Sequence, residues 1–122
     1  MKLDPTNGVP FYRQVETALA ERIRLGDLPA GAMLPSVRGL AQELLVSVIT
    51  VKQAYEALEA DGLVYSAQGR GTFVAADGAA AASRRVRRAL VEVVTAAVAD
   101  ARVAGVPEAE LRTLLLSTLE PR

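Results

Sequence analysis

The pattern of apolar and polar positions predicts a helix near the start of the chain. Pro10 suits the first turn of a helix, because the N–H group that proline lacks would have no partner there. Apolar residues then recur at every fourth position and define one stripe on a helical surface: Phe11, Val15, Leu19 and Ile23. The pattern therefore predicts a first helix over about residues 10–25, ended by Gly26.

Two further helices are expected in quick succession. Ser36 follows a turn-rich segment and is a good N-cap for a short helix over 37–44. A brief turn separates this helix from a third one over 47–60, whose apolar stripe is Val51, Ala54, Tyr55 and Leu58. Two short helices joined by a short turn are typical of a helix-turn-helix.

The stretch that follows the third helix has the pattern of a β-hairpin. The segments LVYS and TFVA are strand-like, and the segment AQGRG between them is typical of a tight turn. A hairpin directly after a helix-turn-helix forms a wing. Residues 1–76 are therefore expected to form a winged helix-turn-helix domain, and the fold class is mainly α with a small β-hairpin.

The composition changes after residue 75, where the segment AADGAAAAS reads as a connector of small residues. A long helix is expected over about residues 83–104 and is ended by Gly105; Pro107 then starts a last helix. Residues 77–122 thus form a short two-helix tail, which contains no aromatic residue and is too small to build a core of its own.

The composition excludes several kinds of chemistry. The chain has no cysteine and no histidine, so it lacks disulfides, thiolate metal sites and the commonest general base. We find no nucleophile–base pair, metal cluster or phosphate-binding loop, and therefore expect neither an enzyme nor a cofactor. The start of the chain has no apolar signal core, and no apolar run approaches the roughly 18 residues that span a bilayer. A cytoplasmic protein with no membrane partner is expected.

Three blocks of sequence, in order and at the right spacing, resemble the GntR family of bacterial transcription regulators: VPFYRQV, GDLPAGAMLPSVRGLAQEL and TVKQAYEALEADGLVYSAQGRGTFV. The resemblance covers about residues 9–75, and the short tail is similar to the YtrA subfamily. It implies a sequence-specific transcription regulator, a repressor that binds double-stranded operator DNA. In that family the third helix enters the major groove and the wing tip approaches the minor groove.

The resemblance also implies which residues bind DNA. Arg38 matches a family arginine that contacts DNA. The reader positions of helix 47–60 hold Ser47, Val48, Ile49, Thr50 and Lys52, and the tip of the wing over 66–72 holds Gln68, Gly69 and Arg70. Helical spacing places Ile49, Lys52 and Gln53 on one face. Lysine can pair with a phosphate or a guanine and glutamine can read adenine, although each of these side chains could also be an ordinary solvated group.

The turn before the third helix departs from the family pattern. Relatives show a sequence like GVNPNTV where this chain has LVSVITV. Val48 could be partly buried against helix 37–44, whereas Ile49 is expected to point outward, where a base edge would lie. Three interpretations of Ile49 stay open: contact with a thymine methyl group, weakened or altered DNA binding, or neutral packing. The alternative function is a winged-helix interaction or dimerisation module that has lost base readout.

The net charge of zero, from 14 basic and 14 acidic residues, indicates that DNA binding must come from a local arrangement. The one dense basic run is SRRVRR over 83–88. Four arginines near a helix N-terminus are unfavourable to the helix dipole, which indicates a compensating partner. The alternative is a solvated first turn.

The wide apolar arc of the long helix predicts a homodimer, since one small domain would leave surplus apolar surface exposed. Packing of this helix onto the chain's own first helix is the alternative. The expected interface comprises Leu90, Val94, Ala97, Val98, Leu111 and Leu115. A twofold dimer implies a roughly palindromic operator. A small-molecule effector, if there is one, would act on the tail or on its joint with the first domain.

Overall fold

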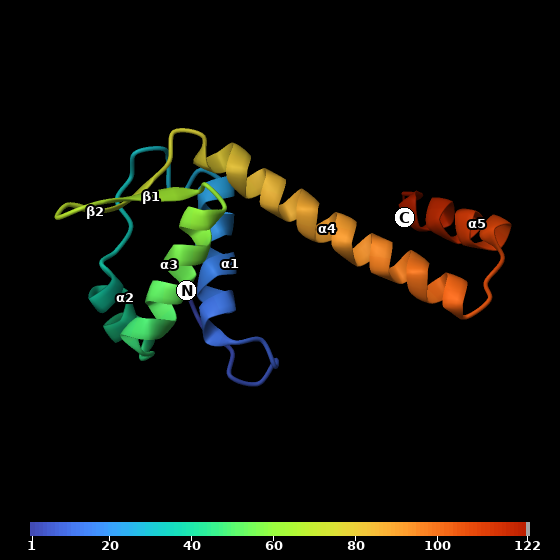
Figure 1. Ribbon diagram of the computed structural model, residues 1–122, viewed down its shortest axis with the longest axis horizontal. Helices are drawn as coiled ribbons and strands as arrows, with labels where there is room; N and C mark the ends of the chain where they lie inside the picture. Colours follow the sequence, from blue (N-terminus) through green and yellow to red (C-terminus); the bar gives the residue numbers. More distant parts are fainter. Residues whose placement is uncertain (122) are drawn as a thin grey trace. The chain divides into compact units, whose positions relative to one another are not determined.

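The structure is a computed structural model that describes residues 1–121 (Figure 1). Its elements follow one another in the order α1 (Phe11–Arg24), α2 (Val37–Leu44), α3 (Val48–Ala60), β1 (Val64–Ala67), β2 (Gly71–Val74), α4 (Gly78–Val103) and α5 (Glu108–Leu119). The chain divides into two compact units, a first unit over Met1–Arg85 and a second unit from Val86 onward. Helix α4 therefore contributes residues to both units.

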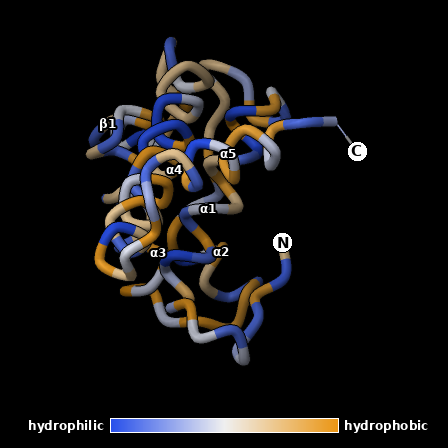
Figure 2. The backbone as a smooth tube through the Cα atoms, turned by 90° about the vertical axis from the view of Figure 1, so that its right-hand side faces the viewer, coloured by the Kyte–Doolittle hydropathy of each residue, from blue (hydrophilic) through white to orange (hydrophobic). Residues whose placement is uncertain are grey.

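The core of the first unit lies between α1 and α3. Three of the four residues of the predicted α1 stripe are fully buried, whereas Phe11 at its start is 37% exposed. All four residues of the predicted α3 stripe are buried: Val51, Ala54, Tyr55 and Leu58. Hydrophobic and hydrophilic residues alternate along these helices (Figure 2). The helical pattern of the sequence therefore predicted this core correctly.

Serine side chains define where α2 and α3 begin. The Oγ of Ser36 accepts a hydrogen bond from the N–H of Gly39 at 3.0 Å. The Oγ of Ser47 accepts one from the N–H of Thr50, also at 3.0 Å. Each bond satisfies a backbone donor that has no partner inside the helix, so the predicted starts of both helices are confirmed.

The wing is an antiparallel hairpin with a short turn. Strand β1 pairs with β2 from Val64 opposite Val74 to Ala67 opposite Gly71. The N–H of Arg70 donates to the carbonyl of Ala67 at 2.9 Å and closes the turn. Gly69 is the third residue of this four-residue β-turn and has a φ of 74°. A β-turn with a positive φ at its third residue favours glycine, which adopts such an angle without strain. The predicted hairpin is confirmed.

Helix α4 begins at Gly78, and not at about residue 83 as the sequence suggested. The small residues Gly78, Ala81 and Ala82 are buried in the first unit. A Cβ atom at Gly78 would lie 2.9 Å from the carbonyl oxygen of Leu63, so only glycine fits there. From Gly78 on, the connector of small residues is thus the first part of α4, and it packs closely because its side chains are small.

Arg85 is bound by two carboxylates of the first unit. Its guanidinium pairs with Glu16 of α1, and its Nε lies 3.3 Å from Asp61 at the end of α3. The Arg85 and Glu16 side chains are only 19% and 5% exposed. Arg84 also lies 3.7 Å from Asp77. For Arg84 and Arg85 the compensating partners are therefore carboxylates of the chain itself, and Arg85 does not belong to a solvated first turn.

Tyr55 makes the stability of the protein sensitive to alkaline pH. Its hydroxyl donates to the carbonyl oxygen of Pro35 at 2.6 Å, and burial raises the pKa of Tyr55 from 10.0 to about 12. The folded state therefore favours the protonated phenol. We expect its contribution to stability to be complete below about pH 10 and to be lost as the pH rises toward about 12.

The measurement is the free energy of urea unfolding between about pH 9 and 11.5, because the tyrosine of the unfolded chain titrates near pH 10. The Tyr55→Phe variant should lose less stability than the wild-type protein over this interval. Tyr65, which is 47% exposed, provides the control Tyr65→Phe. Parallel curves for all three proteins would contradict the prediction.

Candidate nucleic-acid interface

Three cationic side chains are exposed on three different elements of the first unit. Arg38 lies on α2, Lys52 on α3 and Arg70 in the turn between β1 and β2. Within residues 1–121, none of the three forms an ion pair with a carboxylate, whereas Arg24 and Arg85 do. Helices α2 and α3 pack against each other, and the hairpin projects away from the helices (Figure 1). These cations are thus available for an anionic partner.

The outward face of α3 carries three of the predicted reader residues. Ile49, Lys52 and Gln53 are exposed, and Ile49 retains 69% of its accessible surface. The spacing i, i+3, i+4 aligns these side chains on one side of the helix, and the buried stripe occupies the other side. The outward direction expected for Ile49 is therefore observed.

The hydroxyl groups at the start of α3 are engaged with each other. The Oγ of Ser47 lies 2.8 Å from the Oγ1 of Thr50, in addition to accepting the Thr50 N–H. Thr50 is half-buried and Ser47 is exposed. Capping of the helix and the contact between the two hydroxyls thus use about half of the hydrogen-bonding capacity of these two side chains.

The turn between α2 and α3 presents hydrocarbon to its surroundings. Leu45 is 91% exposed and has a φ of 58°, in the left-handed region. Leucine adopts this conformation at a cost of roughly 1–2 kcal/mol, which glycine, the residue at this place in the family pattern, avoids. Val48 is 45% exposed, so only part of its side chain is covered.

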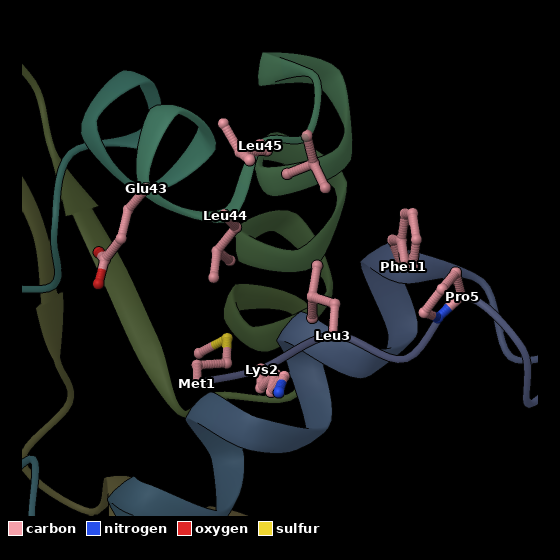
Figure 3. Close-up of a pocket in the computed structure, with 9 residues that line it drawn as sticks. Met1, Lys2, Leu3, Pro5, Phe11, Glu43, Leu44 and Leu45 are labelled. Carbon is pink, nitrogen blue, oxygen red and sulfur yellow. The ribbon is translucent and has the colours of Figure 1, made fainter.

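A hollow of about 350 Å³ lies beside this turn in the first unit. Figure 3 shows Leu3 of the N-terminal segment and Leu44 of α2 pointing toward the same space. Gln14 holds the N-terminal segment in place, because its Nε2 donates to the carbonyl oxygens of Asp4 at 2.7 Å and Val9 at 2.9 Å. The lining is mainly apolar, with Lys2 and Glu43 as its charged members.

In the second unit, five of the six predicted interface residues are wholly or partly exposed. Leu90, Val94 and Leu115 are 59%, 51% and 41% exposed, Ala97 is exposed and Val98 is partly exposed. Leu111 differs, because it is already 92% buried within the single chain, with 8% of its surface exposed. It contributes little to any surface that a second molecule could cover.

A helix-turn-helix followed by a β-hairpin, with unpaired cations on both helices and on the hairpin turn, defines a winged-helix DNA-binding domain. Residues 11–74 match the family model described as bacterial regulatory proteins of the gntR family. That match covers more than half of the chain. The protein belongs to the GntR family.

Individual relatives agree with this assignment, and two of the three named here match most of the chain. The HTH-type transcriptional repressor YtrA of Bacillus subtilis is 30% identical over 106 residues, which cover 87% of this chain and 82% of that protein. A transcriptional regulator from Oenococcus oeni superposes with a TM-score of 0.73 at 25% identity, over 97% of this chain and 98% of the other. AraR(DBD), solved in complex with operator ORX1, superposes with a TM-score of 0.56 at 34% identity and covers 62% of this chain and 93% of its own.

The protein is therefore a DNA-binding transcription regulator of the YtrA type, and its relatives are regulators and not enzymes. Members of the family bind operator DNA through the domain that residues 11–74 form here. No helix within the described residues is long and apolar enough to cross a membrane.

Proposed function

We propose that the protein is a homodimeric repressor that binds a palindromic operator. Residues 1–76 read the DNA, with the helix over 47–60 in the major groove and the wing over 66–72 near the minor groove. Residues 77–122 form the dimerisation tail. The relative from Bacillus subtilis is named a repressor, which supports this direction of regulation. A cytoplasmic location is part of the same proposal.

The observation that carries the proposal is the set of three exposed, unpaired cations on α2, α3 and the wing turn. A phosphate backbone attracts such cations, and the released counterions make the affinity depend on salt. We assign DNA contact to the residues around these cations on the same elements: Arg38, Ser47, Ile49, Thr50, Lys52, Gln53, Gln68, Gly69 and Arg70. The complex of AraR(DBD) with an operator supports this use of the domain.

The dimer is supported by the uncovered apolar arc of α4. Leu90 and Val94 are one helical turn apart, and both are more than half exposed. Ala97 and Val98 follow on the same side at the next turn. We place these four residues and Leu115 in the interface and leave out the buried Leu111. A small-molecule effector would change operator binding only if it bound one geometry of the dimer more tightly than another.

Removal of single cations tests the DNA contacts. We expect Arg38→Ala, Lys52→Ala and Arg70→Ala each to lower operator affinity and to reduce the salt slope by about two, because the dimer loses one phosphate contact in each half-site. The measurement is a titration of a fluorescent duplex from the protein's own upstream region, with a scrambled duplex beside it, at two salt concentrations.

Arg22 is exposed on α1, outside the proposed interface, so Arg22→Ala is the matched control and should bind as the wild-type protein does. An equal loss in Arg22→Ala and Lys52→Ala would contradict the assigned surface. Failure of the wild-type protein to bind any genomic fragment would overturn operator binding itself and favour the interaction-module alternative.

A further inference from the structure

We infer that Ile49 selects a thymine in each half-site by contact with the 5-methyl group of that base; this inference rests on the proposed operator binding. Ile49 retains 69% of its accessible surface at the start of α3. It belongs to a run of exposed apolar side chains in which Leu45 and Val48 are 91% and 45% exposed. An isolated exposed isoleucine needs no explanation, but this one lies within the reading surface.

The position of Ile49 on α3 directs its side chain toward the same DNA groove as the side chain of Lys52. Lys52 follows one turn later and Gln53 lies beside it, so the three side chains share one side of the helix. The opposite side of α3 is buried in the core. When Lys52 reaches a base edge in the major groove, Ile49 faces the same groove near the N-terminal end of the helix.

The hydroxyl groups next to Ile49 have only part of their hydrogen-bonding capacity left for DNA. The hydroxyls of Ser47 and Thr50 lie 2.8 Å apart, and the Ser47 Oγ also caps the helix. One hydroxyl proton at most remains for a partner outside this pair. The first turn of α3 consequently offers bases mainly hydrocarbon.

The chemical groups that each base exposes in the major groove indicate which base Ile49 contacts. In the major groove thymine presents a methyl group beside its O4 acceptor, whereas guanine, adenine and cytosine present hydrogen-bond donors and acceptors without a methyl group. An isoleucine pressed against those polar groups would remove their water without supplying a partner. Contact with one methyl group is expected to change affinity about fourfold per half-site, and about tenfold or more when both half-sites contribute.

Deoxyuridine provides the direct test, because it pairs as thymidine does and lacks only the methyl group. An operator duplex is first selected from random sequences with the full-length wild-type protein. Each thymine is then replaced symmetrically by deoxyuridine, and the affinities of wild type and Ile49→Ala are compared. We expect one position per half-site at which deoxyuridine weakens wild-type binding about tenfold and leaves Ile49→Ala binding unchanged.

Lys52→Ala is the matched control from the same face of α3. It should bind both duplexes more weakly and keep the full difference between thymine and deoxyuridine. Ile49→Ala removes an exposed side chain, and an unchanged melting temperature would show that the variant is folded. If the wild-type protein binds its operator but deoxyuridine replacement affects wild type and Ile49→Ala equally at every thymine, the inference is wrong and the proposed function stands. If wild type selects no duplex, both are wrong.

Discussion

Replacing Arg85 by methionine is expected to lower the free energy of unfolding by about 3–5 kcal/mol, because removal of one partner leaves a buried charge unpaired. The Glu16 carboxylate is 5% exposed. Its Oε1 is bound by Arg85, and its Oε2 has no hydrogen-bond partner. In Arg85→Met this carboxylate would remain in the core between α1 and the start of α4 without a compensating charge. Urea unfolding at neutral pH and constant protein concentration measures the loss.

Two further variants separate the buried charge from other effects of the substitution. Arg84→Met removes a neighbouring arginine that is 62% exposed and 3.7 Å from Asp77, and it should cost less than about 1 kcal/mol. The double variant Arg85→Met/Glu16→Leu should recover most of the lost stability, because it replaces the ion pair by apolar groups. Equal losses in Arg84→Met and Arg85→Met would show that the cluster does not hold α4 in place.

Replacing Val94 by aspartate is expected to dissociate the dimer and to lower operator affinity by a hundredfold or more, because two linked reading domains bind far more tightly than one. Val94 lies in the apolar arc of α4 and is 51% exposed. The substitution therefore places a charge in the proposed interface without disturbing a buried core. Sedimentation velocity measures the oligomeric state, and titration with the intact operator measures the affinity.

Val103 supplies the control for this experiment on the same helix. It follows Val94 by nine residues, which is two and a half helical turns and places it on the opposite side of α4. It is 90% exposed, and Val103→Asp should remain a dimer with wild-type affinity. A Val94→Asp monomer that still binds the intact operator tightly would remove dimerisation from the proposed mechanism, while leaving the DNA-reading surface of the first unit untouched.

The Ile49 and Val94 proposals concern different parts of the same function. Under these proposals, exposed hydrocarbon at the start of α3 selects the preferred base, and exposed hydrocarbon on α4 joins two DNA-binding domains. Neither depends on the net charge of the chain, which is zero. On the proposed mechanism, this neutral protein would bind its operator through a few unpaired cations, apolar base contact and the joining of two half-sites.

The sequence by itself determined the elements that depend on local interactions. The starts of α2 and α3 were predictable because Ser36 and Ser47 cap them through the backbone three residues ahead. The buried side of α3 followed from helical periodicity, and the wing followed from a glycine-containing turn between two apolar segments. The outward face of α3 was predictable for the same reason, since the residues opposite a buried stripe must face outward.

Only the tertiary structure decided features that join distant residues. The start of α4 depends on how Gly78 and its small neighbours pack against the hairpin, and local signals cannot distinguish such a helix from a flexible connector. Glu16 and Arg85 are 69 residues apart, and no local signal in the sequence indicated that Glu16 would be buried or that Arg85 would be its partner. The burial of Leu111 was equally hidden. Burial is decided by which surfaces meet in space, and periodicity along one helix does not contain that information.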